Sequence, residues 1–231
     1  LGINLTIKRI QNAVIAKGYI TTRVVAESQD LNSGRLVLTL IPGVIDAVRV
    51  ARGSGALVNV QTALPAKSGD LLNLRDIEQG LENLKRAPTS EADIQIEPAQ
   101  RAGAGPGASD LVIVWKQRFP ARLSLALDDS GSESTGKYQG SVAVSLDHLW
   151  HSNDLFYASY SHDMGGGNAV SNGTEGHSLH YSLPFGYWML AATLNAYEYF
   201  QAVAGANQTY RYSGESENAE LRLTRVLYRD S

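Results

Sequence analysis

The second half of the chain alternates between polar and apolar residues, and this period of two restricts the folds available to it. Leu123, Leu125 and Leu127 are separated by single polar or small residues, and Val142 and Val144 follow the same pattern. Alternation of this kind makes one face of a β-strand apolar and the other polar, which a helix cannot do. We therefore predict strands over most of the second half.

Six strands and their connectors can be read from this pattern. The connectors 148–153 and 184–187 are short, whereas 129–137, 164–176 and 200–215 are longer and rich in Gly, Ser and Asn. Short turns on one side and long loops on the other are typical of outer-membrane barrels, so we predict that the long connectors are extracellular. The predicted strands are residues 121–128, 138–147, 154–163, 177–183, 188–199 and 216–227.

Aromatic residues are concentrated in the same region. Ten of the eleven tyrosines lie beyond Pro120, and many aromatic residues stand near strand ends. Transmembrane barrels carry aromatic girdles at both membrane interfaces, so we predict that these strands form an antiparallel barrel wall. The girdle would contain Tyr138, Trp150, Phe156, Tyr157, Tyr187, Trp188, Tyr197 and Tyr199.

The alternation assigns each strand residue to one of two faces. The predicted lipid face contains Leu123, Leu125, Leu127, Val142, Val144, Leu146, Leu179, Leu183, Leu190 and Leu194. The predicted pore lining contains Ser124, Ser141, Ser145, Ser178, His180, Ser182, Asn195 and Arg222, with Gln139, Thr193, Glu220 and Thr224 in the same row. Small hydroxyl groups can hydrogen-bond a passing solute or chain without holding it, a lining that any porin could also have.

The first half contains an internal repeat. A helix is predicted behind Asn4 as its N-cap and is closed by Gly18, and strands 19–27 and 35–41 follow. The same order of a helix and two strands returns later, as a helix that begins at Asn73 followed by strands 92–97 and 109–116. This second copy is preceded by a predicted strand 44–50 and a short helix around 57–64. The repeated unit is therefore β-α-α-β-β, and residues 1–43 contain only its C-terminal part.

These segments resemble the transporter partner of two-partner secretion, the haemolysin/filamentous haemagglutinin exporter family. The stretches that carry the resemblance are residues 18–24, 38–43, 73–84, 127–131, 154–163 and 210–214. The resemblance implies α+β polypeptide-transport-associated (POTRA) modules in the periplasm and a porin-like barrel in the bacterial outer membrane. Residues 1–43 would be the end of a first module, 44–118 a second module and 119–231 about six N-terminal barrel strands.

The resemblance also implies a function in protein transport. The POTRA modules would recognise an unfolded secreted exoprotein through its N-terminal secretion domain, and the barrel would export it, as in haemolysin secretion and activation. An extended client can join a free sheet edge, for which strands 19–27 and 92–97 are the candidates. The side chains predicted to flank the added strand are Thr21, Arg23, Asp93 and Gln95.

Several other functions are excluded or weakened by the sequence. Residues 1–120 hold 14 Lys/Arg against 11 Asp/Glu and residues 121–231 hold 6 against 12, so neither half has the basic excess that nucleic-acid binding requires. Residues 131–137 nearly spell a P-loop, but Tyr138 stands where a Ser or Thr is needed, so we predict no nucleotide binding.

No catalytic or cofactor site is predicted. The chain has no cysteine, and no set of residues forms a catalytic constellation. His177 and His180 are three apart on a strand and point to opposite faces, while His148 and His151 are expected to be solvated turn residues. We therefore predict no enzyme activity, no cofactor and no metal.

Two alternatives fit the same pattern. One is an outer-membrane barrel-assembly insertase of the same superfamily, which would carry more modules and no dedicated client. The other is a soluble β-rich binding protein whose second half is a sandwich. Because the chain starts without Met and stops directly after an alternating stretch, we expect it to be an internal fragment of a longer protein.

Overall fold

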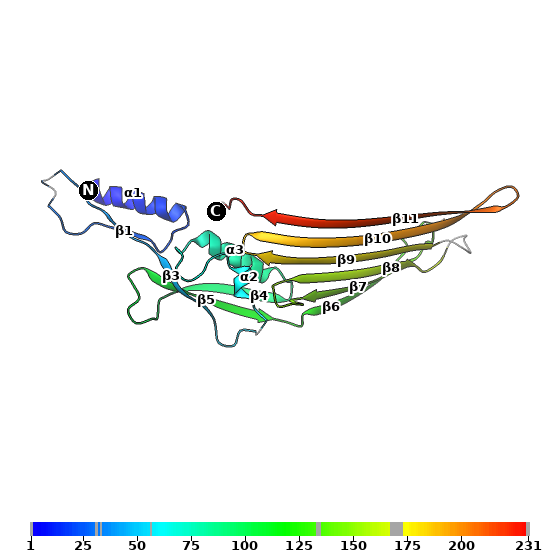
Figure 1. Ribbon diagram of the computed structural model, residues 1–231, viewed down its shortest axis with the longest axis horizontal. Coiled ribbons are helices and arrows are strands. Elements are labelled where there is room, and N and C mark those ends of the chain that lie inside the picture. Colours follow the sequence, from blue (N-terminus) through cyan, green and yellow to red (C-terminus); the bar gives the residue numbers. More distant parts are fainter. Residues whose placement is uncertain are drawn as a thin grey trace.

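The computed structural model describes residues 2–30, 32, 34–55, 57–132, 135–166 and 173–229. The molecule is elongated: helices and short strands lie at one end, and six long strands extend from them as one sheet (Figure 1). In the part of the chain so described, no helix is long and apolar enough to cross a membrane.

The N-terminal part contains helix α1 (Gly2–Ala16) and a two-stranded sheet of β1 (Arg23–Val25) and β2 (Thr39–Ile41). Asn4 lies inside the helix, so the prediction that it is the N-cap was wrong. Gly18, at φ +93°, follows the helix as predicted.

Both predicted strands of this part are much shorter than expected. The side-chain amide of Gln29 accepts from the Val37 N–H at 2.7 Å and donates to the Val37 carbonyl at 2.8 Å. Gln11 likewise bonds the Val24 N–H and the Thr22 carbonyl. The Gln29 side chain therefore takes the backbone groups of Val37 that a longer ladder would use.

The second unit has the predicted β-α-α-β-β order. Its elements are β3 (Val44–Val50), α2 (Val60–Ala63), α3 (Leu74–Lys85), β4 (Ser90–Pro98) and β5 (Ala108–Gln117). Strand β5 is central, parallel to β3 and antiparallel to β4. The helices cover one face of this sheet and enclose a core of Ile45, Leu64, Leu72, Ile77, Leu84, Leu111, Ile113 and Trp115.

The six remaining strands form an antiparallel sheet in sequence order. They are β6 (Ala121–Asp128), β7 (Gln139–Asp147), β8 (Leu155–Asp163), β9 (Gly173–Phe185), β10 (Trp188–Ala204) and β11 (Thr209–Arg225). All six predicted strands are present. Within the connectors, residues 133–134 and 167–172 lie outside the described residues.

The predicted long connector 200–215 was wrong, because β10 and β11 continue through most of it. Gly214 suggested a loop but lies within β11 opposite Tyr199. A Cβ at Gly214 would lie 2.3 Å from the Tyr199 ring, so the glycine leaves room for that ring within a continuous strand. Only residues 205–208 connect the two strands.

The strand register confirms the predicted division into two faces. Leu125 pairs with Val142 and Val142 with Tyr160, so apolar residues of adjacent strands share one face. Ser178 pairs with Ser159 and Asn195, which places polar residues on the other. Every residue of the predicted lipid row lies on the first face, called here the outer face, and every residue of the predicted pore row lies on the second, the inner face.

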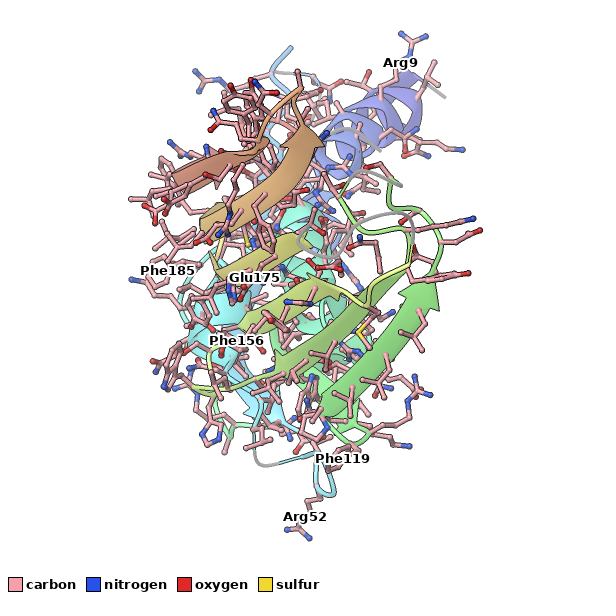
Figure 2. The ribbon with its side chains drawn as sticks, turned by 90° about the vertical axis from the view of Figure 1, so that its right-hand side faces the viewer. Arg9, Arg52, Phe119, Phe156, Glu175 and Phe185 are labelled. Atoms are coloured by element: carbon pink, nitrogen blue, oxygen red, sulfur yellow. The ribbon has the colours of Figure 1, made fainter. Side chains whose placement is uncertain are left out.

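The predicted aromatic girdle needs correction. Phe156 and Trp188 lie on the outer face, but the register places Tyr157, Tyr197 and Tyr199 on the inner face. A residue that faces inward cannot contact the membrane interface, so those three tyrosines are not girdle residues. Figure 2, which looks along the strands, shows Phe156 and Phe185 on the same side of the sheet.

Candidate functional site

The sheet of the second unit has two edge strands in the described residues, β3 and β4. Residues 69–72 hydrogen-bond the start of the β3 edge, whereas no such segment covers the β4 edge among the described residues. In the order β3-β5-β4, strand β4 is terminal. The Ala99 N–H bonds the Ala108 carbonyl and the Arg118 N–H bonds the Thr89 carbonyl, which sets the odd-numbered residues toward β5. The backbone groups of Ala92, Ile94 and Ile96 therefore point to the free edge, while their side chains contribute to the core.

The four predicted client-flanking residues lie in two places. Asp93 and Gln95 are both exposed on β4, and the Gln95 amide donates to the Asp93 carboxylate at 3.4 Å. Arg23 is exposed on β1, in the separate two-stranded sheet. Thr21 precedes β1, and its hydroxyl oxygen is buried without a hydrogen-bond partner. The structure thus brings Asp93 and Gln95 together but not the other two.

The inner face of the large sheet is lined with polar groups that bond one another across strands. The Ser178 hydroxyl donates to the Asn195 side-chain carbonyl at 2.8 Å. His180 Nδ1 lies 2.8 Å from the Thr193 hydroxyl, and its Nε2 lies 3.2 Å from the Ser182 hydroxyl. These polar groups therefore have hydrogen-bond partners within the sheet.

A buried polar contact joins the second unit to the large sheet; we call it the junction. Asn153, in the turn between β7 and β8, is fully buried, and its amide donates to the Asn59 carbonyl at 2.6 Å and the Thr62 hydroxyl at 2.8 Å. In the turn between β9 and β10, the Gly186 N–H donates to the Thr62 carbonyl at 2.9 Å. The Gly186 carbonyl accepts from the Asn83 amide at 2.8 Å.

Further bonds extend the junction along α3 and its C-cap residue Arg86. The Arg86 guanidinium donates to the Ser182 carbonyl at 3.2 Å, and the Tyr187 hydroxyl donates to Asp76 at 2.5 Å. Burial lowers the pKa of Arg86, with partial compensation from Asp154, and burial together with the Asp76 bond raises the pKa of Tyr187. Most polar groups of the junction have therefore exchanged water for one another, whereas the side-chain oxygen of Asn153 is buried without a hydrogen-bond partner in the described part of the chain.

The turn between β7 and β8 has an unusual backbone. His148, His151 and Asn153 all have φ between 55° and 59°, a left-handed conformation in which Asn and His are tolerated better than most residues. The buried Asp154 carboxylate holds this turn by accepting from the Trp150 N–H at 3.2 Å and the Ser152 N–H at 3.0 Å.

His148 is not the solvated residue that the sequence suggested, because only 3% of it is exposed. Its Nε2 lies 2.9 Å from the Ser90 hydroxyl, and its ring meets Trp115 edge-on at 5.2 Å. His177 and His180 lie on opposite faces of β9 as predicted. Among the described residues, no three metal-binding side chains come together.

The burial of His148 predicts a pH dependence of the junction. Burial lowers the pKa of His148 below 6.5, and Asp154 and Asp147 offset only part of this effect. Below pH 6.5 a detached imidazole binds a proton more readily than the packed one. The free energy that holds the junction together should therefore fall as pH falls. We expect the full-length protein to be cleaved faster between module and barrel at about pH 5 than at about pH 7.5. In His148→Asn, which tolerates the same backbone, this difference should shrink; an unchanged difference would assign the effect to another group.

Comparisons with known proteins identify the family. Residues 107–231 match the family model described as haemolysin secretion/activation protein ShlB/FhaC/HecB. The chain belongs to this family. Residues 2–43 match a POTRA domain of ShlB type and residues 44–98 match a POTRA domain. The chain is therefore a part of a two-partner secretion transporter, with POTRA modules followed by the first strands of a β-barrel.

Curated relatives and solved structures agree with this assignment. The outer membrane transporter CdiB-2 of Burkholderia pseudomallei is 42% identical, over 99% of this chain and 38% of its own length. The haemolysin transporter protein ShlB of Serratia marcescens is 25% identical over 99% of this chain and 39% of its own length. The structure of CdiB from Escherichia coli matches 99% of this chain and 42% of its own with a TM-score of 0.86 at 28% identity; that of CdiB from Acinetobacter baumannii covers 97% and 41%, with a TM-score of 0.81 at 32%.

The family also gives the location of the two parts of the chain. The barrel strands lie in the outer membrane and the POTRA modules lie in the periplasm, as in the transporter relatives. The relatives are transporters rather than enzymes. The chain spans about two fifths of the length of the curated relatives it matches.

Proposed function

We propose that the full-length protein recognises an unfolded secreted exoprotein at its POTRA modules and exports it through the barrel pore. The observation that carries this proposal is the free edge of β4, where Ala92, Ile94 and Ile96 present backbone donors and acceptors. An extended client strand can pair with such an edge whatever its side chains are. Asp93 and Gln95 would flank the added strand and contribute to its selection.

The parts of the chain divide this work. Residues 1–43 complete a first POTRA module, residues 44–118 form the second, and residues from 119 onward begin the barrel. The first module would contribute Thr21 and Arg23 near its own short sheet. The inner-face row from Ser124 to Arg222 would line the pore, and the outer face would contact membrane lipid. Nothing in this scheme requires a catalytic group, cofactor, nucleotide or nucleic acid.

Deleting the gene tests the proposal and identifies the client. We expect one large protein to disappear from the culture medium of the deletion strain and to return when the full-length gene is restored. A gene that carries both Asp93→Lys and Gln95→Lys should restore about tenfold less of the secreted protein to the medium. The reason is that lysines beside an incoming strand obstruct edge pairing. Gln61→Lys, an exposed change on α2, should restore secretion fully.

Other outcomes would reject parts of this scheme. Loss of many barrel proteins from the outer membrane, without loss of a secreted protein, would indicate an insertase. Full secretion by the double-lysine variant would show that the β4 edge does not bind the client.

A further inference from the structure

The hairpin of β10 and β11 is too long to lie within the membrane. Each strand has 17 residues, whereas β6, β7 and β8 have 8, 9 and 9. A tilted strand crosses the hydrocarbon core in about 9–11 residues. In Figure 1 the tip of this hairpin extends beyond the ends of the neighbouring strands.

A row of carboxylates shows where the membrane-facing part of the hairpin ends. On the outer face, Glu198 pairs with Glu175 on one side and Glu215 on the other. Three adjacent carboxylates cannot face hydrocarbon. From Trp188 to Ala196 the outer-face residues of β10 are apolar, and this stretch is long enough to cross the membrane. Glu217, which pairs with Ala196, adds a further outer-face carboxylate at the end of this stretch. The part of the hairpin from Tyr197 to Ser216 therefore lies beyond the membrane.

The inner face of this projecting part carries a group of tyrosines, which we call the exit tyrosines. They are Tyr197 and Tyr199 on β10 and Tyr210 and Tyr212 on β11, with 41–63% of each residue exposed. The Tyr199 ring lies over Gly214, where a Cβ would be only 2.3 Å away. Tyr197 follows Asn195 of the predicted pore row on the same face. The tyrosines thus continue the pore lining outward.

The opposite face of the projecting part is different in character. Arg211 lies over the Phe200 ring at 4.5 Å, and Glu198 and Glu215 accompany them. The outer face of the projecting part therefore carries charged residues, which suits contact with water. The four exposed tyrosines lie on the opposite, inner face, which continues the predicted pore row.

We propose that the exit tyrosines form a contact surface for the exported polypeptide as it leaves the pore. This inference rests on the proposed export function and adds a site to it. Tyrosine supplies a large contact area, loses little conformational entropy and hydrogen-bonds peptide groups through its hydroxyl, so it contacts unfolded chains of varied sequence. An emerging segment that binds these rings is less free to slip back.

Site-specific photo-crosslinking tests the contact. The probe is the secreted protein lost from the deletion strain, stalled in the pore by a stably folded domain fused to its C-terminal end. A photoreactive residue replaces Tyr199 or Tyr212 on the inner face, Phe200 or Ser213 on the outer face, or Ser178 in the pore row. We expect adducts with the probe from positions 178, 199 and 212 and only background from 200 and 213.

The outcomes separate this inference from the proposed function. Adducts from position 178 but not from 199 and 212, or equal yields from both faces of the hairpin, would overturn the inference alone. Absence of adducts at all five positions would reject export through this pore and the inference with it.

A functional variant provides a second readout. Tyr199→Ser combined with Tyr212→Ser should retain the folded barrel and slow secretion about fivefold, a loss equivalent to one aromatic contact. Phe200→Ser, on the other face, should secrete at the normal rate. Normal secretion by the double tyrosine variant would overturn the proposal.

Discussion

Leu125→Arg should prevent the full-length protein from assembling in the outer membrane, whereas Ser124→Arg should assemble normally. The two residues are adjacent on β6, but the register places Leu125 on the outer face beside Val142 and Ser124 on the inner face beside Ala143. Arginine near the bilayer midplane costs about 2–4 kcal/mol on the lipid face of a barrel, while substitutions on the lumen face of a barrel are tolerated.

The measurement is the fraction of membrane-inserted protein whose gel mobility depends on heating. We expect this fraction to be close to zero for Leu125→Arg and unchanged for Ser124→Arg. Leu123→Arg and Ser141→Arg repeat the comparison on the same two faces. Equal tolerance of both faces would refute the assignment of the outer face to lipid.

Asn153→Asp should release the second POTRA module from the barrel without unfolding either. The substitution keeps the shape and tolerates the left-handed backbone, but it removes the amide that donates to the Asn59 carbonyl and the Thr62 hydroxyl. It also places a carboxylate oxygen against a carbonyl oxygen in a buried site. Unpaired buried groups cost about 1–3 kcal/mol each, so the attached state should weaken by roughly a hundredfold.

Two readouts distinguish detachment from misfolding. The heat-dependent gel mobility of the barrel should remain normal, while limited proteolysis between Gln117 and Ala121 should become faster and secretion should fall. Asn218→Asp makes the same chemical change at an exposed inner-face position of β11 and should alter neither. Normal proteolysis of Asn153→Asp would show that other bonds of the junction suffice.

Local signals explain what could be predicted from the sequence. Asn73 caps α3 because its side chain accepts from the Arg75 N–H at 2.9 Å, an interaction that depends only on neighbours. The bounds of β6 follow from simple alternation. The division of the sheet into two faces followed for the same reason, since a strand's side-chain direction is set by its period.

The missed features depend on partners far along the chain. His148 was expected to be a solvated turn residue and Asn153 was placed only in a short connector, but their partners Ser90 and Asn59 are 58 and 94 residues away. The alternation alone already placed Tyr199 on the face of Asn195, and its assignment to the girdle came only from its position near a predicted strand end. The length of β10 and β11 beyond Tyr199 was missed because Gly214, opposite Tyr199, resembled a loop residue. Sequence patterns indicate which face a residue can occupy, but not which distant surface covers it.

The turn at Gly186 ties the folding of the two parts together. Both of its backbone polar groups are satisfied by the second module, through Thr62 and Asn83, and a Cβ here would come within 3.3 Å of Pro65. The β9–β10 hairpin therefore reaches its lowest free energy only when the module is already folded beneath it. Detachment of the module would exchange these two hydrogen bonds for bonds to water, so the β9–β10 turn should be more dynamic in the detached protein than in the attached one.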